Sequence, residues 1–325
     1  MSDITADYTR LTPFYPGQWG VPGSYVPSSL IPLLPAGAGN IFFVDGGSTG
    51  PTNDNGDGLT PVSPKRLLQS AINMCVTGHN DVVIVLNYGG NARAVETFPI
   101  LLNKDQTHIV GVQSLSNKWP VVSVLTPAGA DTADPAIHVT GQRCSIRGLE
   151  LGGGNTAGCL HVGSVAGVWG CYVYDCFFGW TGDSVGQDGI RVPAGSDAPY
   201  LTVTGCRFGA SVTRDGVRID GNATRGSIGV PGYPKNIFKR IPGIGINLVG
   251  NTVGIGIFDN TMALPSNTAG KGVTISAGST LAFVDGNRCN FGDTAMANNP
   301  YADGAAGGAN DWLANYQAIT LVMPT

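Results

Sequence analysis

The sequence predicts an all-β solenoid, and three observations lead to that fold class. The chain repeats itself, because DGIRV at residues 188–192 returns as DGVRI at residues 215–219. The repeating segments are short, apolar and rich in β-branched residues, and glycine-rich turns rather than helices separate them. The 325 residues include 49 glycines, and only 12% are charged, about half the usual share. Such a chain has many turns and few solvated helices.

Two columns of aligned segments set the length of the repeat. The first column reads AIHV (136–139), CLHV (159–162), GIRV (189–192), GVRI (216–219) and GVTI (272–275). The second column starts at Ile146, Val173, Val203, Ile257 and Val284. The differences between successive starts are 27, 30, 54 and 27, and 54 equals two periods. The coil period is therefore about 27–30 residues. Stacked coils place equivalent strands about 4.8 Å apart in parallel sheets, and several coils must stack to bury their apolar faces.

The regions on either side of the repeat differ from it in composition. Residues 1–40 carry six prolines and several aromatic residues, so we expect an extended arm. This arm lies either on another surface or on its own body, and both alternatives stay open. Residues 41–80 predict a first strand (IFFV), an Asx/Gly turn and an amphipathic capping helix from Pro64 to about Val76. The β-helix is expected over residues 81–292, and a C-terminal cap or tail strand over residues 293–325. The aromatic residues of the arm are Tyr8, Phe14, Tyr15, Trp19 and Tyr25.

The first part of this arrangement resembles a known family. The residues IFFVDGG, NDNGDGLTPVSPKRLLQSAINMC and then DVVIVLNYGG are similar to the N-terminal end of pectate-lyase-like right-handed parallel β-helix proteins. In that family a strand, a Gly/Asp-rich turn and a capping helix close the solenoid. The resemblance implies a right-handed parallel β-helix over roughly residues 40–292. It does not choose a function, because this fold carries lyases, hydrolases, adhesins and virion proteins.

Composition and charge exclude several classes of function. The formal net charge is −4, and no basic run or RNA-binding motif is present, so a nucleic-acid partner is not predicted. The start MSDITADYTR lacks an apolar core, so no signal peptide is predicted. The longest apolar stretch, SSLIPLLPAGAG, is broken by Pro32 and Pro35 and is too short for a membrane span of about 20 residues. The seven cysteines include no CxxC pair and are expected to be reduced and buried.

Four aspartates are the candidates for catalysis: Asp183, Asp188, Asp215 and Asp220. The repeat places Asp188 and Asp215 one coil apart, and two carboxylates about 5 Å apart match a retaining glycosidase pair. Arg191 and Arg218 follow three residues later in each coil. The same spacing therefore equally predicts surface ion pairs and turn caps, and catalysis is the less favoured interpretation.

A polar ladder is predicted on the outside of the solenoid at His138, His161, Arg191 and Arg218. The two histidines lack a third ligand, so no metal is predicted there. The Asx turn NDNGDG starts like a calcium loop, but Pro64 stands where that loop needs a bidentate glutamate. We therefore expect no metal and no other cofactor.

Aromatic residues crowd one coil of the repeat: Trp169, Tyr172, Tyr174 and Trp180. With Val173 pointing inward, Tyr172 and Tyr174 are expected to point outward. Exposed amphipathic aromatics suit either a sugar platform or a subunit interface. We favour the interface, because an exposed patch of this kind otherwise lowers solubility.

Two functions follow as hypotheses. The arm, the capped solenoid and the compact C-terminal end together resemble bacteriophage head-decoration, spike and tail-fibre proteins of the β-helix kind. That resemblance implies a structural protein on the virion surface, assembled in the host cytoplasm, a homotrimer, and attachment to the major capsid protein or another virion protein. The alternative is a polysaccharide-degrading or glycan-binding tailspike that uses the β-helix flank on cell-surface glycan, with Asp188 and Asp215 as its catalytic candidates.

Overall fold

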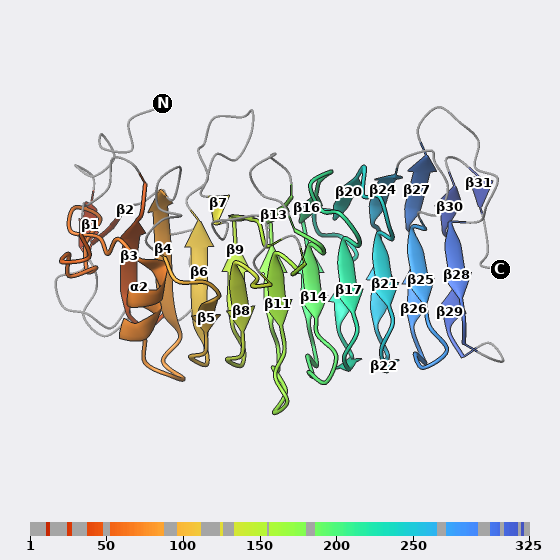
Figure 1. Ribbon diagram of the computed structural model, residues 1–325, viewed down its shortest axis with the longest axis horizontal. Helices are drawn as coiled ribbons and strands as arrows, with labels where there is room; N and C mark the ends of the chain where they lie inside the picture. The colour runs from red at the N-terminus through yellow and green to blue at the C-terminus, as the bar shows by residue number, and fades with distance from the viewer. Residues whose placement is uncertain are drawn as a thin grey trace.

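The chain winds into a parallel β-helix whose coils stack along one long axis, from the red N-terminal end to the blue C-terminal end of Figure 1. This computed structural model confirms the predicted fold class. The structure describes residues 11–13, 25–27, 38–47, 53–87, 96–111, 124–125, 133–154, 156–179, 186–264, 271–291, 300–305, 309–317 and 320–321. Within these residues, no helix is long and apolar enough to cross a membrane.

Three sheets form the walls of the solenoid, and successive strands of the chain pass from sheet A to sheet B to sheet C. Sheet A has eight strands: β5 (Ile100–Leu102), β8 (Ile137–Val139), β11 (Leu160–Val162), β14 (Ile190–Val192), β17 (Val217–Ile219), β21 (Ile246–Leu248), β25 (Val273–Ile275) and β28 (Tyr301–Asp303).

Sheet B has ten strands: β3 (Ile41–Asp45), β4 (Asp81–Asn87), β6 (Thr107–Gly111), β9 (Ser145–Arg147), β12 (Tyr172–Tyr174), β15 (Thr202–Thr204), β19 (Ser227–Ile228), β23 (Gly256–Phe258), β26 (Phe283–Asp285) and β29 (Asp311–Trp312). Sheet C has nine strands: β7 (Val124–Leu125), β10 (Glu150–Leu151), β13 (Phe177–Phe178), β16 (Arg207–Phe208), β20 (Ile237–Lys239), β24 (Thr261–Leu264), β27 (Arg288–Phe291), β30 (Tyr316–Gln317) and β31 (Thr320–Leu321).

Two small sheets lie outside these walls. The antiparallel strands β1 (Leu11–Pro13) and β2 (Tyr25–Pro27) pair within the region predicted to be an arm. The parallel strands β18 (Ala223–Thr224) and β22 (Thr252–Val253) pair between neighbouring coils. All pairings between consecutive strands of the three walls are parallel except the last, where β31 runs antiparallel to β30.

The register of sheet A shows the coil length directly. Ile190 pairs with Val217, Val217 with Ile246, and Ile246 with Val273, so the residue number advances by 27, 29 and 27 from coil to coil. The sequence pattern missed the coil at β21, because Leu248 stands where the other coils have valine or isoleucine. The tetrapeptides GVRI (216–219) and GVTI (272–275) are 56 residues apart. This difference is the sum of the two coil lengths, 29 and 27.

The turn from sheet B to sheet C explains the second sequence column. Its first residue has a positive φ, as at Gly148 (69°), Asp175 (50°), Gly205 (67°) and Asp259 (54°), which suits glycine and short polar residues. The next residue of each turn points into the core and is buried: Leu149, Cys176, Cys206, Asn260 and Asn287. All seven cysteines are free and buried.

Asparagine side chains continue this inward column toward the C-terminal end. The Asn236 amide donates to Asn260 Oδ1 at 2.9 Å, and the Asn260 and Asn287 amides donate to the next Oδ1 along the column, at 2.8 and 2.9 Å. Asn315 ends this row by donating to the Val284 carbonyl. Each coil is therefore tied to the next by buried hydrogen bonds as well as by apolar contacts.

The capping helix is shorter than predicted. Helix α2 spans Leu68–Met74 rather than Pro64 to about Val76. The backbone amides of Arg66 and Leu67 donate to Asp54 Oδ1, and those of Leu68 and Gln69 donate to the carboxylate of Glu96. The carboxylate of Asp54 thus holds the chain extended up to Leu67, where φ is −100° and ψ is 132°.

The first strands of sheet B bury both of their faces. Phe42, Val83 and Ile109 point into the main core, while Ile41, Phe43, Val82, Ile84 and Val110 form a second apolar cluster on the opposite face. In these strands the sequence is a continuous apolar run rather than an alternating one, which is typical of a strand that is buried on both faces.

Candidate functional site on the outer face of sheet A

The predicted polar ladder lies in register on the outer face of sheet A. His138 pairs with His161, His161 with Arg191, and Arg191 with Arg218. Their neighbours within each strand point into the core, as the alternating burial of β11, β14 and β17 shows. Asn247 and Thr274 extend the same row through β21 and β25.

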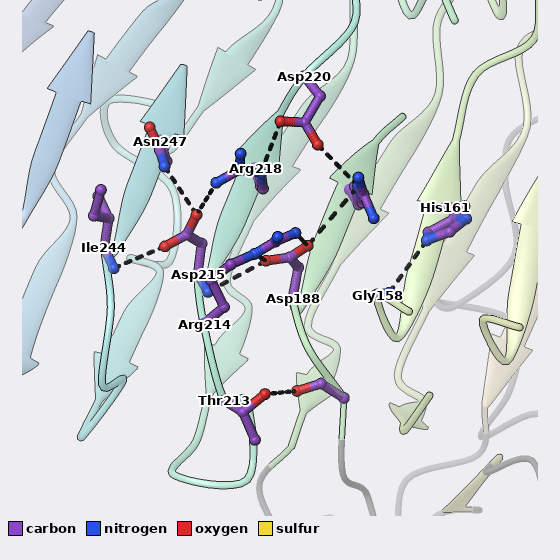
Figure 2. A network of polar contacts seen from close by, with 12 residues as sticks. Gly158, His161, Asp188, Thr213, Arg214, Asp215, Arg218, Asp220, Ile244 and Asn247 are labelled. Carbon is purple, nitrogen blue, oxygen red and sulfur yellow. Dashed lines mark hydrogen bonds and ion pairs between the residues drawn. The ribbon is translucent and has the colours of Figure 1, made fainter. Parts of the chain in front are cut away.

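Asp188 lies just before β14, and its carboxylate is fully buried. Arg214 from the next coil binds both of its oxygens: Arg214 Nε donates to Oδ1 at 2.8 Å, and Nη2 donates to Oδ2 (Figure 2). The backbone amide of Asp215 also donates to Oδ1, at 3.3 Å. Arg191, the partner expected from the spacing within one coil, is more distant, with 4.0 Å between Nε and Oδ2.

Asp215 occupies the equivalent position one coil later and is 2% exposed. Its Oδ2 accepts hydrogen bonds from Arg218 Nη1 at 2.8 Å and from Asn247 Nδ2 at 2.9 Å. Its Oδ1 accepts the backbone amide of Ile244 at 2.9 Å. Asp215 therefore caps the turn of the following coil while it pairs with an arginine of its own coil (Figure 2).

Asp220 joins the two arginines of the ladder. Its Oδ2 accepts Arg191 Nε at 2.9 Å, and its Oδ1 accepts Arg218 Nε at 2.7 Å. The cluster thus holds three carboxylates against three guanidinium groups and has no net charge. We call this set the Arg/Asp cluster: Asp188, Arg191, Arg214, Asp215, Arg218 and Asp220.

The pKa values in the Arg/Asp cluster reflect burial opposed by ion pairing. Burial raises the pKa of the Asp188 carboxyl, and the hydrogen bonds and charge of Arg214 oppose that shift. The hydrogen bond to Asp188 in turn raises the pKa of Arg214. A bidentate pair of this kind is a strong charge-assisted contact, and taking away one partner leaves an unpaired buried charge.

This geometry limits what the two aspartates can do chemically. A retaining glycosidase pair needs one carboxylic acid that gives up a proton and one carboxylate that attacks the sugar. Every carboxylate oxygen of Asp188 and Asp215 accepts at least one hydrogen bond from the cluster or the backbone. Proton transfer at either residue would first require an ion pair to break. Asp220 is paired with Arg191 and Arg218, and Asp183, the remaining candidate, lies outside the described residues.

Sequence reasoning missed Arg214 and Asn247. Arg214 directly precedes Asp215, whereas Gln187 stands at the equivalent position before Asp188. The difference between arginine and glutamine at this position was visible in the sequence, but it did not show that Arg214 pairs with Asp188 of the previous coil. Asp220, which follows β17 directly where Pro193 follows β14, was among the candidate aspartates, but its pairing with both Arg191 and Arg218 was not predicted.

The two histidines continue the row without forming a metal site. His138 donates through Nε2 to the Gly163 carbonyl at 3.0 Å, and His161 accepts the Gly158 amide at Nε2 at 3.2 Å. Their ring centroids lie 6.0 Å apart, edge to face. Burial, with smaller contributions from His138 and Arg191, lowers the pKa of His161 to about 4. Across the described ranges, no group of three or more His, Cys, Asp or Glu could hold a metal ion.

The aromatic residues of the crowded coil divide into two sets. Tyr172 and Tyr174 lie on the outer face of β12, with nearly parallel rings and centroids 6.0 Å apart. Trp169 lies on the turn before that strand and contacts Tyr200 of the next coil, with centroids 5.5 Å apart. The side chains of Tyr8, Phe14, Tyr15, Trp19, Tyr25 and Trp180 lie outside the described part of the chain.

These features define a class: a parallel β-helix protein with a neutral, hydrogen-bonded Arg/Asp cluster on one wall. Among solved structures, the crystal structure of pectate lyase Pel9A is similar to this chain, with a TM-score of 0.42 and 12% sequence identity, over 88% of this chain and 82% of that chain. No protein-family model and no curated protein matches the chain. The fold assignment rests on the strand pairing of the chain itself.

Proposed function

We propose that this protein is a structural component of a bacteriophage particle, a capsid-decorating or spike protein. In this proposal it attaches to the major capsid protein or another virion protein through residues 1–40 and assembles as a β-helical homotrimer. The observation that carries the proposal is the Arg/Asp cluster. Its aspartates hold consecutive coils together and leave no uncommitted carboxylate pair among Asp188 and Asp215.

The contacts between coils support a mechanical role. Asp188 pairs with Arg214 of the next coil, Asp215 accepts from Asn247 of the coil after that, and the asparagine row ties the opposite side of the solenoid. Bonds that run along the axis resist separation of the coils, and such a body suits a spike or a decoration that is exposed on a particle.

The outer face of β12 supports assembly. Tyr172 is 38% exposed and stacks with Tyr174 on that face. Tyrosine pairs of this kind are enriched where proteins meet, because the ring is apolar and the hydroxyl stays hydrogen-bonded. Contact between such faces of neighbouring copies would give the proposed trimer its buried area.

Cleavage of polysaccharide by Asp188 and Asp215 is the less favoured alternative. Both carboxylates are buried and paired with arginines, so neither has the freedom that an acid or a nucleophile needs. Burial does raise the pKa of Asp188, which by itself would suit an acid, but Arg214 occupies both of its oxygens.

The decisive experiment locates the protein in its native assembly. Cryo-electron microscopy of intact particles is expected to show trimeric rods on the particle surface, and deletion of residues 1–40 is expected to abolish their attachment. As the control, the Asp188→Asn/Asp215→Asn variant is assayed on capsular polysaccharide beside the wild type. The proposal would be overturned if the wild-type protein depolymerises the polysaccharide, the variant does not, and the wild-type protein is absent from particles.

A further inference from the structure

A serine, a histidine and an asparagine form a continuous hydrogen-bonded line near the start of sheet B. His108 on β6 pairs in register with Ser145 on β9. Both side chains lie on the outer face, because their neighbours Ile109 and Ile146 belong to the main core. Nδ1 of His108 lies 2.7 Å from Ser145 Oγ, and Nε2 lies 2.6 Å from Asn80 Oδ1. Asn80 directly precedes β4, so three consecutive coils supply the three groups.

The Asn80 carbonyl oxygen fixes the tautomer of His108. An amide carbonyl oxygen only accepts hydrogen bonds, so the proton of the neutral ring lies on Nε2. Nδ1 is then an acceptor, and the Ser145 hydroxyl donates to it. Burial lowers the pKa of His108 to about 4, although the Asp81 carboxylate acts in the opposite direction, so the ring is neutral at pH 7. Ser145 therefore faces an imidazole nitrogen that accepts its proton, which is the arrangement of nucleophilic hydrolases.

A second serine of the same outer row provides a comparison. Ser227 lies three coils after Ser145 in register. Its hydroxyl donates to the Gly229 carbonyl, which is the ordinary contact of a serine with nearby backbone. Ser145 instead pairs with a histidine of the previous coil. Ser145 is partly exposed, whereas His108 is only 8% exposed, so the base is sheltered from water while the hydroxyl is open to it.

Two hydrogen-bond donors without partners lie beside Ser145. Tyr172 pairs with Ser145 in register on β12 and is 38% exposed. Within the described residues, neither the Tyr172 hydroxyl nor the Arg143 guanidinium has a hydrogen-bond partner. A Cβ atom at Gly170 would lie 3.7 Å from Tyr172 Cε2 and 3.7 Å from Arg143 Cγ, so the two side chains flank the same glycine. A phenol and a guanidinium suit the negative oxygen that forms when a carbonyl group is attacked.

We propose that Ser145 is the nucleophile of an ester-hydrolysing site, with His108 as its general base and Asn80 as the residue that positions the histidine. This activity goes beyond the structural role proposed above and is independent of it. The substrate class is a carboxylic ester with a small acyl group. The acyl group is small because His108 and Tyr172 flank Ser145 on the two neighbouring strands, each about 4.8 Å away.

The reaction needs only water besides the ester and the protein. Ser145 Oγ attacks the carbonyl carbon while its proton moves to His108 Nδ1. The carbonyl oxygen becomes an oxyanion that the Tyr172 hydroxyl and the Arg143 guanidinium stabilise. The bond to the alcohol oxygen then breaks, and His108 returns the proton to that oxygen. Water hydrolyses the acyl-Ser145 ester through the same proton transfers and releases the carboxylic acid, while Asn80 Oδ1 holds the Nε2 proton throughout.

The test is covalent labelling of the full-length protein with a fluorophosphonate, which reacts with activated serine hydroxyls. Mass spectrometry of the intact protein and of its peptides is expected to find an adduct at Ser145 and none at Ser227. His108→Gln should slow the labelling about 100-fold or more, as the loss of a general base predicts. Ser227→Ala is the matched control and should be labelled at the wild-type rate. Circular dichroism verifies that each variant is folded.

Asn80→Asp tests the positioning residue. A carboxylate at this place stabilises the imidazolium, so the pH at which labelling reaches half of its maximal rate should rise, which a merely structural role would not cause. The wild type should also hydrolyse p-nitrophenyl acetate faster than Ser145→Ala does. The inference is overturned if the folded wild-type protein is not labelled at Ser145, and this outcome depends on no variant. It is also overturned if His108→Gln is labelled at the wild-type rate, or if Ser145→Ala hydrolyses the ester equally fast.

Discussion

Arg214 crosses from one coil to the previous one and binds both carboxylate oxygens of Asp188, a side chain with no exposed surface. This pair couples neighbouring coils at a carboxylate that is cut off from water. On the outer face of sheet A, charge-assisted hydrogen bonds rather than apolar contacts therefore hold these two coils together.

The Arg214→Met variant is expected to be strongly destabilised. Removing the guanidinium leaves the Asp188 carboxylate buried and unpaired, which costs about 3–5 kcal/mol of the free energy of unfolding. Urea denaturation measures the loss. Arg288→Met is the control, since Arg288 is exposed and a surface change of this type stays within about 0.5 kcal/mol. Equal stability of the two variants would show that the Asp188 pair does not hold the wall.

Replacing Asn260 by leucine tests the asparagine row. Leu149 fills the equivalent position of an earlier coil, so the shape is tolerated, but Asn236 Nδ2 and the neighbouring amide groups lose their partner. We expect Asn260→Leu to lower the free energy of unfolding by about 3 kcal/mol, because unsatisfied buried groups cost about 1–3 kcal/mol each. The exposed Asn73→Leu serves as the reference. A midpoint shift no larger than that of Asn73→Leu would contradict the role of the row.

The residue that lies two positions before a strand of sheet B has a positive φ at Gly254 and Leu281. Two substitutions with opposite expected effects on stability test this position. Gly254 has a φ of 68°, and an added Cβ would meet only Arg225 Cγ at 3.9 Å. Gly254→Ala should therefore cost about 1 kcal/mol from the backbone alone. Leu281 has a φ of 55° and is 67% exposed, so Leu281→Gly should be neutral or raise stability by up to about 1 kcal/mol. Thermal unfolding of both variants measures these changes in stability. Destabilisation of both variants would be incompatible with this explanation.

Stability should fall as the pH falls from 6.5 to 4. Burial lowers the pKa of His108 to about 4, below the value of about 6.5 in an unfolded chain. The folded state therefore binds fewer protons in this window, and stability that is present above pH 6.5 is lost toward pH 4. For His108 the loss between pH 7 and pH 5 is about 2 kcal/mol. Urea denaturation at both pH values should show a smaller loss for His108→Gln, and an unchanged loss would refute the assignment.

The thiols should be unreactive in the folded protein. All seven cysteines are buried, and burial raises the pKa of Cys75 and Cys144 to about 12 and that of Cys171 well above its usual value. Because the thiolate is the reactive form, iodoacetamide should label none of the seven at pH 8 in buffer and all of them in urea. Mass spectrometry counts the adducts, and rapid labelling of the native protein would contradict the buried column.

The repeat itself was readable from the sequence, because each coil must meet the same local conditions. Ile190 and Val192 face the core while Arg191 faces outward, and the same alternation returns at Val217, Arg218 and Ile219. The residue after six strands of sheet B, β9, β12, β15, β19, β23 and β26, has a positive φ, which selects glycine and aspartate. Period, inward columns and outward ladder therefore follow from alternation and from turn chemistry. The start of the helix at Leu68 did not follow, because the carboxylates of Asp54 and Glu96 come from elsewhere in the chain.

By itself the sequence determined that the chain is a parallel β-helix with a regular coil length. It also determined that His161, Arg191 and Arg218 share one wall, and that Asp188 and Asp215 lie one coil apart. Only the tertiary structure decided that Arg214 rather than Arg191 neutralises Asp188, that Asp220 bridges two coils, and that Trp169 meets Tyr200. The physical reason is the range of the interactions. Alternation and φ are local to a few residues, whereas the partner of a long side chain depends on turns of unequal length that shift one coil against the next.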